Sequence, residues 1–126
     1  MIKRLGTIAA ALVLGAAGTG LAATQAWAGN VDSRGCVRVY VEYESINDTQ
    51  RRVWWAEATN ACSYSWSGHF ELGKNNGPDR NPAPSHRVNL GGIIVNKGQY
   101  CVEGVAWRND GAGKFFELGR VCTRVV

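Results

Sequence analysis

CVRVYVEY, residues Cys36 to Tyr43, is the stretch that decides the fold. Apolar and polar side chains alternate along it, which predicts a β-strand with one buried face. RVWWAEAT, residues 52–59, predicts a second strand because it is rich in β-branched and aromatic side chains, and turn residues precede it at 45–49. The two strands form a predicted hairpin that ends at Cys36 and Cys62. Its buried side is expected to consist of Val37, Val39, Val41 and Tyr43.

The rest of the chain also favours short strands. We expect a third strand over residues 64–72, with Tyr64, Trp66, Phe70 and Leu72 on its buried face. A loop rich in Pro and Asn follows at 73–85, and a strand at 86–90 continues over 93–95 after Gly91 and Gly92. The last hairpin pairs residues 100–108 with 115–125. The predicted fold class is all-β: a small antiparallel β-sandwich or barrel of about six to seven strands with two disulfide-closed hairpins.

The four cysteines predict two disulfides. Three pairings are possible on paper, and the two hairpins select Cys36 with Cys62 and Cys101 with Cys122. If Cys101 lies directly opposite Cys122, then Glu103 faces Arg120 and Trp107 faces Phe116. No two cysteines have the Cys-x-x-Cys spacing that is typical of zinc sites, so we expect neither a metal site nor a cofactor.

The first 28 residues predict a secretory signal peptide. Lys3 and Arg4 precede an uncharged apolar stretch over residues 8–23, and Ala26-Trp27-Ala28 has the small residues that a signal peptidase recognises. We therefore expect a mature domain of residues 29–126 that is secreted to the extracellular space and has no membrane anchor after signal cleavage. Of the 14 Lys and Arg residues, two lie in the signal peptide, whereas all 10 Asp and Glu residues remain. This near balance favours no nucleic-acid partner.

Three segments carry a resemblance to a known family: Cys36 to Tyr40, Thr59-Asn60-Ala61-Cys62, and the strand that leads to Gly77-Pro78-Asp79. They resemble the small exported β-sandwich proteins of actinobacteria typified by the proteinaceous α-amylase inhibitors. The resemblance covers about the first half of the mature chain, and it implies a disulfide-stapled sandwich that displays loops to a partner. Those inhibitors have a Trp-Arg-Tyr triplet on the first hairpin, whereas this hairpin has Arg51-Arg52-Val53-Trp54-Trp55. The resemblance therefore does not imply that the target is an amylase.

Trp54, Trp55 and Arg80 are the candidate partner-binding residues. Neighbouring strand residues point to opposite faces, so one of the two tryptophans cannot face the core. The exposed ring could anchor a partner protein or stack on a sugar, or a loop such as 73–85 could cover it. Arg80 lies in that Pro-rich loop, which could be offered to the cleft of a protease or could be a solvated linker.

These features favour an exported non-catalytic binding protein whose partner is a secreted protein or a polysaccharide. An inhibitor of a secreted hydrolase is the first form of this hypothesis, and a carbohydrate or cell-wall binding module is the alternative. A small exported enzyme comes last: His69 and Glu71 share a strand face, but a solvated polar face explains them as well, and the sequence has no recognisable nucleophile. We therefore expect no catalytic residue.

Overall fold

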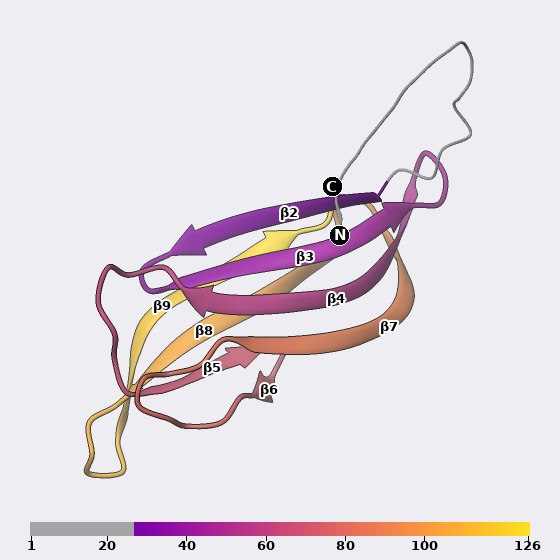
Figure 1. The fold of residues 1–126 in the computed structure, drawn as a ribbon. Coiled ribbons are helices and arrows are strands. Elements are labelled where there is room, and N and C mark those ends of the chain that lie inside the picture. Colours follow the sequence, from indigo (N-terminus) through magenta and orange to yellow (C-terminus); the bar gives the residue numbers. More distant parts are fainter. Residues whose placement is uncertain (1–26) are drawn as a thin grey trace.

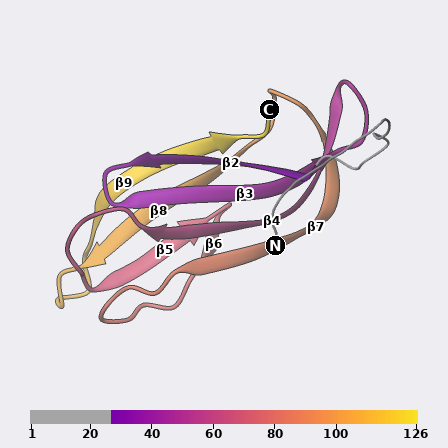
Figure 2. The same ribbon diagram turned by 45° about the horizontal axis from the view of Figure 1, so that its top comes forward.

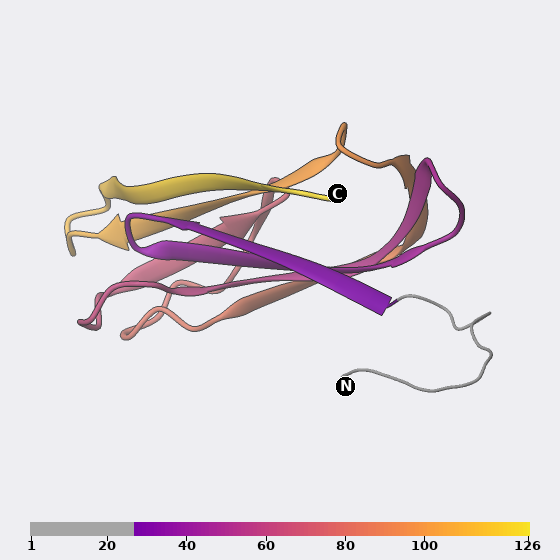
Figure 3. The same cartoon turned by 90° about the horizontal axis from the view of Figure 1, so that it is seen from above.

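A computed structural model describes residues 27–126 of the chain, which form two four-stranded antiparallel sheets (Figure 1). In spatial order, the first sheet contains β2 (Trp27–Arg34), β3 (Val37–Ser45), β4 (Gln50–Asn60) and β7 (His86–Asn96). The second contains β6 (Asn75–Asn76), β5 (Gly68–Leu72), β8 (Cys101–Asn109) and β9 (Phe115–Arg124). The four strands of the first sheet run side by side in Figure 2, and Figure 3 shows the two sheets as separate layers. The predicted all-β sandwich is confirmed, with eight strands in the described residues instead of six or seven.

The core lies between the sheets, and the alternation of β3 decides which side chains enter it. Val37, Val39 and Val41 are fully buried and Tyr43 is almost so, which confirms the predicted face. The second sheet contributes Phe70, Leu72, Val102 and Ala106 to the same cluster. The outward side chains of the first sheet point away from this core, and the candidate site lies among them.

Both predicted disulfides are confirmed. Cys36 is bonded to Cys62 and closes the β3–β4 hairpin, and Cys101 is bonded to Cys122 across β8 and β9. Residues 27–126 contain no free cysteine. Two disulfides indicate that the protein folds in an oxidising compartment.

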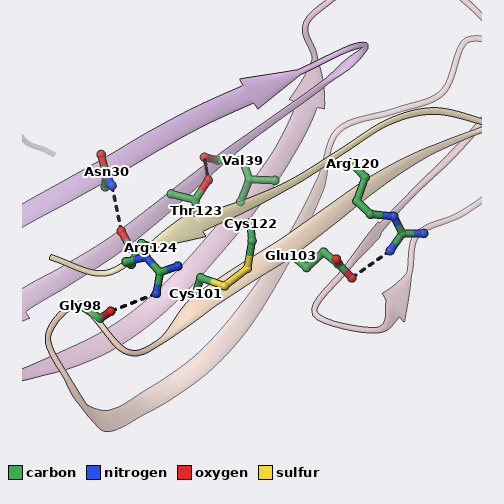
Figure 4. Close-up of a disulfide and its surroundings, with 9 residues drawn as sticks. All are labelled: Asn30, Val39, Gly98, Cys101, Glu103, Arg120, Cys122, Thr123 and Arg124. Atoms are coloured by element: carbon green, nitrogen blue, oxygen red, sulfur yellow. Dashed lines mark hydrogen bonds and ion pairs between the residues drawn. A yellow bond between two sulfur atoms is a disulfide. The ribbon is translucent and has the colours of Figure 1, made fainter.

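The register predicted for β8 and β9 is wrong by two residues. Cys101 is paired with Arg124 and Glu103 with Cys122, so the disulfide joins diagonal neighbours whose Cα atoms are 5.5 Å apart. The twist of a sheet shortens one diagonal, and a disulfide can therefore form there as well as between directly opposed residues. Figure 4 shows this bond beside a second diagonal pair, Glu103 and Arg120, whose charged atoms are 3.0 Å apart.

A bulge between Ala106 and Trp107 shifts the same ladder again. Trp107 consequently faces Glu117 instead of the predicted Phe116. Phe116 itself is half exposed.

Strand β2 is absent from the prediction because its side chains form no alternating pattern. It is an edge strand with exposed side chains along most of its length, and backbone pairing with β3 holds it in place. Two hydrogen bonds near it link the sheets (Figure 4): Asn30 donates to the Arg124 carbonyl at 2.8 Å, and the buried Thr123 hydroxyl donates to the Val39 carbonyl at 2.8 Å.

The third predicted strand is shorter than expected. It forms only over Gly68–Leu72, and residues 64–67 precede it as an irregular segment. Trp66, Phe70 and Leu72 are buried as predicted, but Tyr64 is 56% exposed. The prediction failed at Tyr64 because alternation places side chains only where the strand is regular.

The predicted signal peptide lies almost entirely outside the described residues, since β2 begins at Trp27. Within residues 27–126, no helix has the length and apolar character needed to cross a membrane.

Candidate functional site

A β-bulge at Trp54 decides the geometry of the candidate site. On β3, Tyr43 pairs with Val53 and Glu42 with Trp55, so Trp54 is skipped. On β7, the partners of Val53 and Trp55 are Ile93 and Asn89, so Trp54 is skipped there too. Val53 and Ala56 are both fully buried, which leaves Trp54 and Trp55 together on the outer face. The prediction of opposite faces is therefore wrong, because the extra residue interrupts the alternation.

The two tryptophans line a common hollow on the outer face of the first sheet. Its volume is about 460 Å³, and Arg87 and Asn89 of β7 complete its lining. Both indole rings are partly exposed. The Asn89 side-chain oxygen accepts the Gly91 N–H at 2.8 Å, which fixes the amide and leaves its nitrogen as a donor group.

Trp55 is stacked between two side chains. The ring of Tyr40 on β3 has its centroid 5.3 Å from that of Trp55. On β7, the guanidinium carbon of Arg87 lies 3.7 Å from the Trp55 ring centroid, which is close enough for a cation–π interaction. Arg87 also contacts Glu57 at 3.3 Å. These contacts hold the guanidinium over the ring while half of the arginine side chain stays exposed.

Trp54 is held by a buried carboxylate. Its indole N–H donates to Glu44 at 3.1 Å, and Arg52 lies 3.5 Å from the same carboxylate oxygen. Glu44 is only 5% exposed, and its second oxygen has no hydrogen-bond partner among the described residues. The ring also packs against Gly92, where a methyl group would lie 2.8 Å from the indole. Trp54 is thus held in place by a hydrogen bond on one side and by backbone packing on another.

Arg80 lies on the other sheet. Its backbone forms two hydrogen bonds of 2.9 Å with Gly68, at the end of β5. Its side chain is exposed and donates to the Asp79 carbonyl at 3.2 Å. The cations beside the tryptophans are Arg87, over Trp55, and Arg52, whose guanidinium carbon is 6.0 Å from the Trp54 ring centroid. A partner-binding role for Arg80 stays a prediction.

Sequence reasoning missed Arg87, Asn89 and Tyr40 as members of the site. Their place depends on the pairing of β4 with both β3 and β7, which requires the bulge to be known. The one signal in the sequence is the Gly91-Gly92 break, because paired glycines in a strand mark an irregular backbone. That break lies beside the skipped Trp54.

His69 and Glu71 do not form a pair. The His69 ring nitrogen is 3.3 Å from Asp79, and Glu71 accepts the indole N–H of Trp107 at 2.8 Å. Each side chain is thus committed to its own neighbour. Residues 27–126 also contain no group of three or more His, Cys, Asp or Glu side chains that could hold a metal ion.

No protein-family model, curated protein or solved structure matches this chain. The chemistry of the outer face is accordingly the basis for a function. That face combines three aromatic rings with N–H donors from a stacked arginine and an oriented amide. Such a surface can bind a partner through apolar contact and hydrogen bonds.

Proposed function

We propose that this protein is an exported non-catalytic binding protein that contacts a secreted protein through the outer face around Trp55. The observation that carries the proposal is the stack of Tyr40, Trp55 and Arg87, with Trp54 beside it. Trp, Tyr and Arg are the residue types that dominate binding energy in protein interfaces. The stack is also pre-ordered, so binding loses less side-chain entropy than it would with a free arginine.

The arginine favours a protein partner over a sugar. A sugar ring that stacks on tryptophan needs an open ring face, whereas Arg87 covers Trp55 at 3.7 Å. A protein partner can instead use the guanidinium for bidentate hydrogen bonds to a carboxylate. The resemblance to exported inhibitors supports a secreted hydrolase as the form of this partner.

The hollow itself supports a second candidate, a carbohydrate-binding module. Its volume of about 460 Å³, two indoles and amide donor suit a small sugar unit. In this alternative, Arg87 must move aside before a sugar can stack on Trp55. The two candidates therefore predict opposite effects of removing the arginine side chain.

To test this, the full chain is exported from a bacterial host. Its binding is then measured to a panel of secreted proteases and glycosidases, and separately to insoluble polysaccharides. For a protein partner, Trp55→Ala and Arg87→Ala should each weaken binding, the former by about 2 kcal/mol or roughly 30-fold. The matched control is Trp107→Ala, since Trp107 is a partly exposed tryptophan on the outer face of the second sheet.

Three results would count against the protein partner. Equal losses in Trp55→Ala and Trp107→Ala would show a general loss of folding, and unchanged affinity in Trp55→Ala would remove the face from consideration. Binding to a polysaccharide that improves in Arg87→Ala and is lost in Trp55→Ala would favour the carbohydrate module.

A further inference from the structure

Strand β2 passes through the predicted signal-peptide cleavage site. Ala28 pairs with Tyr43 and Gly29 with Glu42, in continuous register with the rest of the strand. Because β2 is an edge strand, one polar group of the Ala28–Gly29 peptide bond faces β3 and the other faces away from the sheet. Pairing on the β3 side keeps this bond against the sheet, whereas a peptidase cleft needs a segment that is free on both sides. We therefore expect cleavage after Ala28 to precede the docking of β2 on β3.

Gly29 lies in the same cross-strand row as the centre of the candidate site. The row runs from Gly29 to Glu42, from Glu42 to Trp55 and from Trp55 to Asn89, one residue on each strand of the first sheet. Directly paired residues share a face of the sheet and have Cα atoms about 4.5–5.5 Å apart. The α-nitrogen of Gly29 thus lies within reach of the Glu42 side chain.

Gly29 also contacts the aromatic stack. A methyl group at residue 29 would overlap the Tyr40 hydroxyl, so the tyrosine ring lies against the backbone of Gly29. The Tyr40 hydroxyl donates to the Glu42 carboxylate. Tyr40 in turn stacks on Trp55, with ring centroids 5.3 Å apart. Gly29 is therefore joined to Trp55 through contacting side chains.

We infer that the mature amino terminus is part of the binding surface: cleavage after Ala28 creates an α-ammonium group at Gly29 that pairs with Glu42 beside the Tyr40–Trp55 stack. Hydrolysis adds one water across the Ala28–Gly29 bond, so that Ala28 leaves with a carboxylate and Gly29 keeps the protonated amine. Precursor and mature protein then differ at this surface by one positive charge and its donors. The inference rests on the proposed function for the role of the surface, but the pairing itself does not.

The charged neighbours favour this pairing. On the outer face of β3, the titratable groups nearest to Gly29 are Glu42 and Tyr40, and Glu44 lies two pairs further along, opposite Trp27. Tyr43, between them, is buried in the core. On β9, Arg124 lies at the other face of β2, where its carbonyl accepts the Asn30 amide. The nearest carboxylate on the outer face therefore attracts the ammonium. Arg52 and Arg87 on that face belong to β4 and β7 and lie against the tryptophan rings, and Arg124 lies on the opposite side of β2.

The test exports the full precursor from a bacterial host and first determines the amino terminus of the secreted protein by sequencing. The pKa of its α-amine is then measured from the pH dependence of its acetylation rate by mass spectrometry. A precursor with Gly-Ser-Gly-Ser inserted after Ala28 is the control, because it moves the amine about 13 Å, past the last β2–β3 pair. A second variant, Glu42→Gln, keeps the shape and removes the charge.

We expect Gly29 as the first residue and an amine pKa about one unit above the ordinary range of roughly 7.7–8.0. The insertion and Glu42→Gln should each return the pKa to that range, and the insertion should also weaken binding to the partner. A different first residue, or an equal pKa in all three proteins, would overturn the inference.

The two proposals fail in different ways. An ordinary amine pKa combined with lost binding in Trp55→Ala overturns the pairing and leaves the proposed function standing. A raised pKa combined with unchanged binding in Trp55→Ala shows the pairing but overturns the binding role of the face, and with it the role of the amine in binding.

Discussion

Substituting Gly92 with alanine tests whether Trp54 is firmly seated. Gly91 and Gly92 have φ angles of 68° and 75°, in the left-handed region that disfavours side chains. A methyl group at Gly91 meets nothing within 4 Å, whereas one at Gly92 lies 2.8 and 3.0 Å from two carbons of the Trp54 ring. Gly91→Ala is therefore a matched control with the same backbone strain and no contact with the indole.

The expected loss of stability has two contributions: the cost of a left-handed backbone and the cost of overpacking against the indole. Left-handed backbone costs a residue with a side chain about 1–2 kcal/mol, and both variants lose this amount. Optimal carbon contacts lie near 3.5–4.0 Å, so the ring must move in Gly92→Ala, and such overpacking costs about 1–3 kcal/mol more. Gly92→Ala should thus be about 1–3 kcal/mol less stable than Gly91→Ala. Movement of the ring also lengthens the hydrogen bond from Trp54 to Glu44.

Urea unfolding followed by circular dichroism gives the free energy of unfolding of both variants, and near-ultraviolet dichroism reports the packing of the indole. Only Gly92→Ala should change the near-ultraviolet signal and weaken partner binding. If the two variants lose equal stability, within about 0.5 kcal/mol, then the indole moves without cost and our account of the hollow is wrong.

Two further predictions concern stability. Replacing Cys36 and Cys62 with alanine should cost about 3.5 kcal/mol in the chain-entropy model and replacing Cys101 and Cys122 about 3.3 kcal/mol, since they are 26 and 21 residues apart. Because Cys36 is 3% exposed and Cys122 is exposed, urea unfolding should show the larger loss for the first pair, and the reverse order would contradict this reasoning. Burial raises the pKa of Tyr100, so its neutral form adds stability below about pH 10 that is lost as the pH rises through the folded-state pKa. Absorbance at 295 nm should show this late titration, and Tyr100→Phe should flatten the alkaline loss of stability; an unchanged profile would refute the assignment.

The parts of the fold that sequence predicts best are those in which one physical rule acts alone. The alternating valines predict β3 correctly because a one-residue shift in register would expose all of them to solvent. The two disulfides follow from the same hairpins. By contrast, the exposed side chains of β2 give no pattern, because its pairing depends on backbone groups that every sequence has.

The candidate site was predicted only in part. Trp54 and Trp55 were singled out, but an inserted residue changed which face they share, and alternation alone does not reveal a bulge. The β8–β9 register failed for a related reason, since a disulfide fits a diagonal pair as well as an opposed pair. Arg87 could not be assigned to the site from the sequence, because its position depends on the pairing of β7 with β4.

The connections at 73–85 and 110–114 differ in how much inserted sequence they can accept. Residues 73–85 continue the edge of β5 through hydrogen bonds from Gly77 to Phe70, between Arg80 and Gly68, and from Ala83 to Trp66. An inserted epitope would break that edge. The turn at 110–114 is exposed throughout, and Asp110 makes only local hydrogen bonds to Ala112 and Lys114. Since lengthening such a loop costs only about 0.6 kcal/mol per doubling, this turn is the place to graft a peptide or a fluorophore tag on the disulfide-bonded scaffold.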